Sequence, residues 1–266
     1  MKLEDYLSRI DYQGQPRADL ECLTAIHRQH LLHIPYENLD VQLGRPLDLD
    51  MDRIFDKIVR RHRGGWCYEM NGLLGWALAE IGFDVMRLAG GVMRSQGGDA
   101  MLGNHLVLAV QLDRTYIADV GLGNGLIEPA PLEVGPITQG FRISRLEQIE
   151  DDYWRFHNFP GALPLDFDFR YEAADESKLA ESCAGLQSDP ESKFLQNLLC
   201  MRFHPEGARF LLGKMLFTFS GLESTKRTLD SEEELNQALS EIFNLHDMPT
   251  GDLWPQVVAR HKELFD

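Results

Sequence analysis

The apolar residues in the first third of the chain recur at helical spacing. They predict a short helix over residues 3–10 and a longer helix over residues 20–32. Two more helices are predicted over residues 51–61 and about residues 67–81, with Gly82 placed as a C-terminal cap. The first block of the chain is therefore predicted to be a helical layer.

After Gly82 the pattern changes to the short Val- and Leu-rich runs that are typical of strands. Several of these runs are separated by prolines and turn residues. They predict an antiparallel second block, which we expect to form a small barrel or sandwich. The predicted strands cover residues 83–93, 105–112, 115–120, 152–159 and 166–171.

Helical patterns return in the last part of the chain. The predicted elements are a weak helix over 175–184, a strand over 209–216 and clearer helices over 231–243 and 253–265. There are no internal repeats or long linkers, so the three blocks are expected to pack into one compact α+β body. We expect the blocks to span residues 1–83, 84–195 and 196–266.

The charge balance narrows the possible partners. The formal net charge of −16 argues against nucleic acid or an anionic membrane as the main partner, because phosphate surfaces would repel the protein. The N-terminal residues lack the pattern of a signal peptide, and no apolar run reaches the length of a membrane span. We therefore expect a cytoplasmic protein, either a monomer or a homodimer.

The cysteines and clustered histidines do not indicate a metal site. The four cysteines are far apart and form no Cys-x-x-Cys pair, so free thiols are expected rather than a zinc site or disulfides. His27, His30 and His33 lack a nearby Glu or Cys that would complete a ligand set. A solvated helix face is the favoured interpretation of these histidines, and no metal is expected.

One stretch, Arg-Gly-Gly-Trp-Cys-Tyr-Glu-Met-Asn at residues 63–71, carries candidate chemistry. Cys67 lies at or just before the first turn of a predicted helix, where unpaired N–H groups and the helix dipole favour a thiolate. The two glycines allow close backbone approach, and the same turn is suited to binding an oxyanion. The polar residues of the loop at 34–40 are expected to brace this turn. Cys67 is thus a candidate nucleophile, although the pattern alone leaves open a role as a small buried hydrophobe.

A nucleophilic cysteine needs a base and a group that orients the base. His105, which opens a predicted strand, and Asp119, which ends the next one, are the candidates. A regular hairpin would place Asp119 opposite residue 109, leaving His105 about 13 Å further along the strand. A bend or bulge is then needed to bring the two together. On spacing alone, a surface histidine and a turn aspartate remain the favoured interpretation.

These residues resemble the motifs of the arylamine N-acetyltransferases. The matching stretches are Ile-Pro-Tyr-Glu-Asn-Leu-Asp at 34–40, the block at 63–71, Asn-His at 104–105 and Asp-Val-Gly-Leu-Gly at 119–123. They occur in the order and at the spacing of that family, and the resemblance covers about residues 1–130. It implies a helical bundle, a central antiparallel β-barrel and a C-terminal α/β lid, with a cysteine-protease-like Cys-His-Asp core.

The resemblance also implies a reaction. Cys67 would accept an acetyl group from acetyl-CoA, with His105 as base and Asp119 as its orienter. The acetyl group would then pass to an arylamine or arylhydrazine, which makes the mechanism ping-pong. A family-like amide synthase with another acyl donor, a cysteine-dependent hydrolase and a binding protein without activity are the alternatives.

Further residues are candidates for binding the two substrates. Gly103, Asn104 and Gly123 are candidates for CoA contacts, since glycines permit close backbone approach. Trp66 and Leu122 are candidates for the acceptor pocket, and Leu122 stands where the family usually has Phe. Candidates for the CoA phosphates are Arg87, Arg94, Lys193, Arg202 and Lys214.

Overall fold

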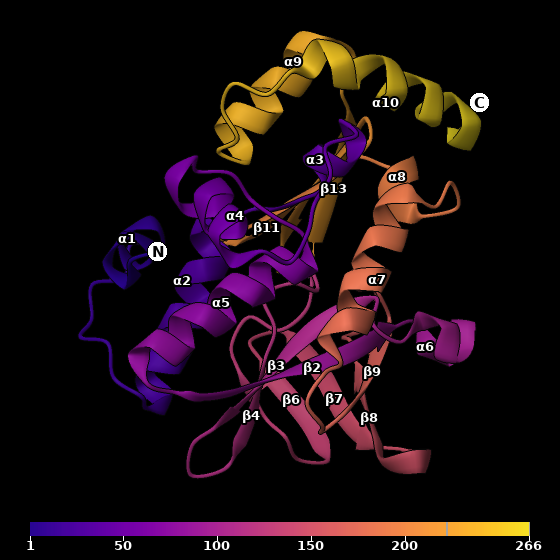
Figure 1. The fold of residues 1–266 in the computed structure, drawn as a ribbon. Helices are drawn as coiled ribbons and strands as arrows, with labels where there is room; N and C mark the ends of the chain where they lie inside the picture. The colour runs from indigo at the N-terminus through magenta and orange to yellow at the C-terminus, as the bar shows by residue number, and fades with distance from the viewer. Residues whose placement is uncertain (222, 266) are drawn as a thin grey trace.

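The computed structural model describes residues 1–221 and 223–265, and its first layer is helical, as predicted (Figure 1). Gly82 ends the last helix of this layer with φ of 104°, which confirms the predicted cap. The predicted helix over 51–61 changes to π-helical geometry in its second half. The helices are α1 (Leu3–Arg9), α2 (Leu20–His33), α3 (Leu39–Gln42), α4 (Met51–Phe55) with its continuation η1 (Asp56–Arg60), and α5 (Cys67–Ile81).

The second layer is an eight-stranded antiparallel sheet that curls into a nearly closed barrel beneath the helices (Figure 1). Its strand order is β5-β4-β3-β2-β9-β8-β7-β6, which confirms the predicted antiparallel barrel. The strands are β2 (Asp84–Val92), β3 (His105–Gln111), β4 (Thr115–Ala118), β5 (Ala130–Pro131), β6 (Gly135–Gln139), β7 (Arg142–Gln148), β8 (Tyr153–His157) and β9 (Asp166–Arg170). The short helices between them are α6 (Arg94–Gly97), η2 (Gly98–Met101) and η3 (Glu150–Asp152).

Strand β7 was missed in the sequence because its pattern is inverted. Arg142 and Ser144 are buried, whereas Ile143 between them is 59% exposed. A strand with a polar inner face does not show the apolar alternation on which sequence patterns depend. Leu146 is buried on the same face, so the polar part of that face consists of Arg142 and Ser144.

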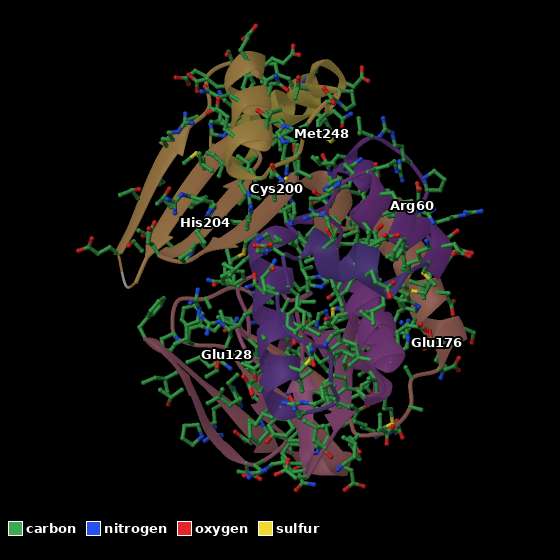
Figure 2. The ribbon with its side chains drawn as sticks, turned by 90° about the vertical axis from the view of Figure 1, so that its left-hand side faces the viewer. Arg60, Glu128, Glu176, Cys200, His204 and Met248 are labelled. Carbon is green, nitrogen blue, oxygen red and sulfur yellow. The ribbon has the colours of Figure 1, made fainter. Side chains whose placement is uncertain are left out.

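The third part is a five-stranded sheet covered by helices, and Figure 2 shows Cys200 and His204 on its strand β10. The predicted strand over 209–216 is in fact parts of two strands, joined by a turn at Gly213 with φ of 54°. The strands are β10 (Leu199–His204), β11 (Gly207–Leu212), β12 (Met215–Ser220) and β13 (Glu223–Thr228). The helices that cover this sheet are α9 (Glu232–Gln237) with η4 (Ala238–Ile242) and α10 (Thr250–Phe265). The preceding helices are α7 (Glu176–Ser188), which packs against Trp66 and Cys67, and α8 (Lys193–Gln196).

The fifth strand of this sheet comes from the other end of the chain. Strand β1 (Tyr36–Glu37) lies in the loop between α2 and α3 and pairs with β10, with Tyr36 opposite Met201. The side chain of Asn38 extends this junction by donating to the carbonyl oxygens of Phe194 and Asn197. The first block of sequence therefore contributes a strand to the third layer.

The interpretation of the α2 histidines as a solvated helix face was wrong for two of the three. His27 and His30 are fully buried, because each ring is hydrogen-bonded inside the protein. His27 Nε2 accepts from the backbone N–H of Asp119 at 3.2 Å, and Tyr6 Oη lies 2.9 Å from His30 Nδ1. Within residues 1–221 and 223–265, no group of three potential ligands could hold a metal ion, and no helix is long and apolar enough to cross a membrane.

Candidate active site

The turn before Cys67 depends on a close approach between two backbone segments. Gly65 donates its N–H to the Pro35 oxygen at 3.3 Å and accepts from the Glu37 N–H at 3.0 Å. A Cβ at Gly64 would lie 2.0 Å from the same Pro35 oxygen, so only glycine fits there. This close approach fixes the position of Cys67, the first residue of α5, directly after the turn.

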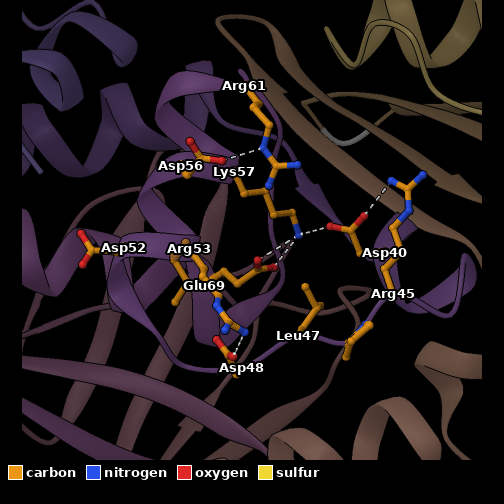
Figure 3. Close-up of a pocket in the computed structure, with 12 residues that line it drawn as sticks. Asp40, Arg45, Leu47, Asp48, Asp52, Arg53, Asp56, Lys57, Arg61 and Glu69 are labelled. Atoms are coloured by element: carbon orange, nitrogen blue, oxygen red, sulfur yellow. Dashed lines mark hydrogen bonds and ion pairs between the residues drawn. The ribbon is translucent and has the colours of Figure 1, made fainter.

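A buried ion cluster lies beneath this turn. It consists of the cations Lys57 and Arg63 and the carboxylates Glu37, Asp40 and Glu69, and Figure 3 shows the Lys57 ammonium pointing at Glu69 and Asp40. The Lys57–Glu69 distance is 2.8 Å, and the Arg63–Glu37 distance is 2.7 Å. Glu69 also accepts the backbone N–H of the residue before Cys67, at 3.2 Å. The cluster confirms that polar residues at 34–40 brace the turn.

Lys57 stays charged in this cluster because the neighbouring carboxylates attract its ammonium group. Burial alone would lower the pKa of Lys57, but the carboxylates of Glu37, Glu69 and Asp40 outweigh burial and raise that pKa. Removing one partner would leave an uncompensated charge in the interior, which is strongly destabilising. The turn is therefore held by interactions that tolerate little change.

The structure brings Cys67, His105 and Asp119 together. His105 Nε2 lies 2.8 Å from Asp119 Oδ2, and the ring is close enough to the Cys67 side chain for that group to raise the pKa of His105. Cys67 Sγ lies 3.8 Å from the backbone oxygen of Asn104, and its residue is 3% exposed. Because Nε2 faces the carboxylate, Nδ1 is the ring nitrogen left for the thiol.

The predicted hairpin register was wrong by two residues. Leu108 pairs with Ala118, so Asp119 comes opposite residue 107 rather than residue 109. Strand β4 ends at Ala118, where the chain leaves the ladder, and the Asp119 side chain reaches His105 from there. Asp119 and His105 are therefore offset by only two residues along β3, instead of the four residues expected from the sequence.

The Asp119 carboxylate is held in place by three partners. Besides His105, the Asn71 side-chain amide and the Gly121 N–H each donate to Oδ1 at 2.8 Å. The Asn71 oxygen accepts the Val120 N–H at 2.9 Å, which fixes the start of the following loop. Asn71 belongs to the motif at residues 63–71, but the sequence alone predicted no role for it. Its position four residues after Cys67, on the same helix face, was the signal that could have revealed one.

The imidazole of His105 is stabilised in its protonated form. Burial disfavours its charged form, but attraction to Asp119 and the hydrogen bonds to Asp119 and Cys67 outweigh burial and raise the pKa to about 10. His27, whose ring supports the backbone of Asp119, behaves in the opposite way. Burial lowers its pKa to about 4, so it remains neutral. The two histidines thus have separate roles, one charged and one purely structural.

Two of the predicted CoA contacts, Gly103 and Asn104, already have hydrogen-bond partners inside the protein. The Gly103 oxygen accepts from Tyr68 Oη at 2.6 Å, and the Asn104 side chain bonds the backbone of Val92 through both its oxygen and its nitrogen. Gly123 has φ of 75° and borders a small cavity with Met201. Contact with CoA remains a prediction for all three.

The two predicted pocket residues are both buried. Trp66 is fully buried and packs edge-on against Tyr68 and Phe194, at centroid distances of 5.4 and 5.3 Å. It packs in a buried cluster with Cys67, and its contact with the acceptor remains a prediction. Leu122 is 7% exposed and packs in the barrel core, where it contacts the glycine position at 125. Its influence on the acceptor remains a prediction.

Most of the basic candidates for the CoA phosphates are engaged elsewhere. Arg87 pairs with Glu176, and Arg94 pairs with Asp168 and Asp99. Arg202 donates to two backbone oxygens in the interior, and Lys214 lies over the Trp254 ring. Lys193 is the first residue of α8. Phosphate binding by these residues remains a prediction.

The comparisons with known proteins agree with this geometry. A family model described as N-acetyltransferase matches residues 19–248. An arylamine N-acetyltransferase of Mycolicibacterium smegmatis is 36% identical over 100% of this chain and 99% of its own length, and arylamine N-acetyltransferase 1 of Homo sapiens is 32% identical over the same shares. The solved structure of the Mycobacterium marinum arylamine N-acetyltransferase in complex with CoA has a TM-score of 0.88 and 28% identity, and covers 96% of this chain and 98% of that one.

The fold and these relatives define an acyltransferase enzyme. The chain belongs to the arylamine N-acetyltransferase family, as its motifs predicted.

Replacing Gly64 with alanine should damage the turn. The added Cβ would meet the Pro35 oxygen, which is backbone and cannot move aside cheaply, so we expect a loss of about 2–4 kcal/mol in the free energy of unfolding. Gly185→Ala is the matched control, because nothing lies within 4 Å of that exposed position in α7 and alanine there should stabilise by about 0.5–1 kcal/mol. Denaturant unfolding measures both changes, and equal stability of Gly64→Ala and wild type would contradict the close approach.

The proton on His105 should make stability depend on pH. Its pKa rises from 6.5 to about 10 on folding, so the folded state holds the proton more tightly than the unfolded state. The stabilisation is complete below pH 6.5 and is lost as the pH rises through about 10. The difference in free energy of unfolding between wild type and His105→Gln should therefore narrow over this window, by at most about 1.4 kcal/mol per pH unit. A difference that stays constant would rule out such a proton.

Proposed function

We propose that this protein transfers the acetyl group of acetyl-CoA to an arylamine or arylhydrazine through a thioester on Cys67. The observation that supports the proposal most directly is the contact of Cys67 with a His105–Asp119 pair at the start of α5. A family relative of nearly the same fold binds CoA. Cys67 is proposed as nucleophile, His105 as base and Asp119 as the group that orients the base.

In the first half-reaction, the sulfur of Cys67 attacks the acetyl carbonyl carbon of acetyl-CoA, and the thiol proton resides on His105. The unpaired N–H groups in the first turn of α5 are suited to stabilise the oxyanion that develops. When the tetrahedral intermediate collapses, the carbon–sulfur bond to CoA breaks. His105 returns the proton to the departing CoA thiolate, which leaves acetyl-Cys67 and free CoA.

In the second half-reaction, the acceptor amine attacks the same carbonyl carbon, and His105 takes the proton that the amine loses. Forming the thioester prepares His105 for this task. Its raised pKa depends partly on a hydrogen bond and charge attraction to Cys67, and both disappear when the sulfur is acetylated. The pKa of His105 is therefore lower in the acetyl-enzyme, so that more of the imidazole is unprotonated and able to accept the proton of the amine. Expulsion of the Cys67 thiolate releases the amide.

The proposal also covers the location of the protein, its partners and the reaction that competes with acetyl transfer. A cytoplasmic location is consistent with four cysteines that are all free in the structure, and the acceptor is a small molecule. A monomer or homodimer with no nucleic acid partner is in keeping with the strongly acidic chain. Hydrolysis is the main competing reaction, and it differs in using water as the acceptor. The 3% exposure of Cys67 favours transfer, because it limits access of bulk water to the thioester.

Mixing the protein with acetyl-CoA alone should add one acetyl group, on Cys67, and an arylamine should then remove it. Intact-mass analysis followed by peptide mapping measures both steps. Cys183→Ser is the control, because it removes a second buried thiol, on α7, and the variant should still be acetylated on Cys67. An unchanged mass, or a label on another cysteine, would contradict the thioester mechanism, whereas loss of the label in buffer as fast as with amine would favour hydrolysis.

His105→Gln and Asp119→Asn should slow alkylation of Cys67 by iodoacetamide at neutral pH by about tenfold or more, because each removes a group that stabilises the thiolate form. His33→Gln is the matched control, since the His33 side chain bonds the Gln29 oxygen of its own helix and lies outside the proposed mechanism. Melting curves of all three variants check that they are folded. Wild-type alkylation rates in folded His105→Gln and Asp119→Asn would remove both residues from the proposed mechanism.

A further inference from the structure

Tyr68 follows the nucleophile directly and is the second residue of α5. Its side chain is fully buried, and Oη donates to the backbone oxygen of Gly103 at 2.6 Å. Burial raises the pKa of the Tyr68 phenol, so the hydroxyl keeps its proton and remains a donor. A side chain that serves to fill the core needs no hydroxyl, because a phenylalanine ring packs in the same way. The hydroxyl of Tyr68 therefore acts through Gly103.

Contacts on both sides of His105 join the start of α5 to the segment at residues 103–106. They are Tyr68 Oη to the Gly103 oxygen at 2.6 Å, Cys67 Sγ to the Asn104 oxygen at 3.8 Å, and the Asn71 amide to the Leu106 oxygen at 2.6 Å. His105 is the remaining residue of this segment. The backbone before and after the proposed base is therefore held against the helix that carries the nucleophile.

The same segment is also fastened to β2. The Gly103 N–H donates to the Gly90 oxygen at 2.9 Å, and the Asn104 side chain bonds the backbone N–H and oxygen of Val92 at 2.7 and 3.2 Å. Helix α7 lies against it, since a Cβ at Gly103 would come within 2.7 Å of Ser182 Oγ. The segment therefore has fixed neighbours in the barrel and in α7, and the tyrosine hydroxyl sets its position relative to α5.

Among these contacts, the one from Tyr68 can be removed without changing a reacting group. Cys67 is the proposed nucleophile, and the Asn71 amide also holds Asp119. The Tyr68 hydroxyl reaches the reaction through the backbone that leads to His105. Proton transfer from the thiol requires hydrogen-bond reach, and a displacement of about 1 Å is enough to lower a rate by about 100-fold. A bond that fixes the backbone next to the base therefore bears on the rate.

We propose that Tyr68 is a positioning residue for acetyl transfer, whose hydroxyl holds the backbone at Gly103 against α5 and thereby sets the distance between His105 and Cys67. The inference rests on the proposed acetyl transfer and adds a residue to it. In this role Tyr68 touches neither substrate and transfers no proton, because its hydroxyl is bonded to Gly103. The base is thus fixed from the first turn of α5 as well as by Asp119.

Tyr68→Phe removes the hydroxyl and keeps the ring that packs against Trp66. Acetylation of Cys67 should slow by about 10-fold, measured as a single-turnover rate at saturating acetyl-CoA. The pH midpoint for alkylation of Cys67 by iodoacetamide should rise by about half to one pH unit, because a displaced imidazolium stabilises the thiolate less. Peptide mapping assigns the alkylated residue.

Tyr6→Phe is the matched control. Tyr6 is also fully buried, and its hydroxyl lies 2.9 Å from His30 Nδ1 in the helical layer. Both variants lose a buried hydrogen bond and should lose similar stability in denaturant unfolding. Tyr6→Phe should keep the wild-type acetylation rate and alkylation midpoint, so a change in Tyr68→Phe reports the position of the base instead of a general loss of stability.

The alkylation midpoint decides the proposal. An unchanged midpoint in Tyr68→Phe overturns it, and so does an equal rise in Tyr6→Phe. A higher KM for acetyl-CoA with an unchanged midpoint also overturns it and assigns the Gly103 segment to donor binding. If wild type forms no acetyl-Cys67, the proposed function fails separately. The midpoint still tests the positioning role in that case, because alkylation needs no acyl donor: a rise in Tyr68→Phe alone supports it, and no rise overturns it.

Discussion

The structure depends on the contact between the turn at residues 63–66 and the loop at residues 34–40. Backbone hydrogen bonds join Gly65 to both Pro35 and Glu37, and the missing side chain of Gly64 allows the two segments to touch. The ions beneath them keep this arrangement in register, since Lys57 and Arg63 pair with carboxylates of the loop at 34–40, and Lys57 also pairs with Glu69 of α5. This contact fixes the position of Cys67 relative to His105, because α5 starts directly after the turn at residues 63–66.

Much of the fold could be predicted because local patterns agreed with the packing. The helices of the first layer have clear apolar faces, and α5 lies between two glycine signals that define its ends. The nucleophile was also accessible to prediction, since a cysteine after two glycines at a helix start has a local chemical meaning. The resemblance to the family's motifs added His105 as the base and Asp119 as the group that orients it. The spacing between these two residues could not justify that assignment by itself.

Features that depend on distant partners could not be predicted. The His105–Asp119 contact rests on the hairpin register, and an error of two residues made it look out of reach. His27 reads as polar in sequence, yet it is buried because the Asp119 backbone uses its ring as an acceptor. Strands β1 and β13 were missed because one has two residues and the other is largely exposed, so neither carries an apolar pattern.

Strand β1 has a consequence for how the protein is made. Its partner β10 begins at Leu199, and the Asn38 side chain bonds residues that lie near position 195, so the first layer completes its contacts only with residues about 160 positions later. As the chain leaves the ribosome from its N-terminus, the loop that braces Cys67 therefore waits for most of the chain to emerge. A nascent chain that already contains Cys67, His105 and Asp119 would still lack the support of its nucleophile turn. The thiol is thus assembled into its reactive setting late in synthesis, after its chemical partners are already present.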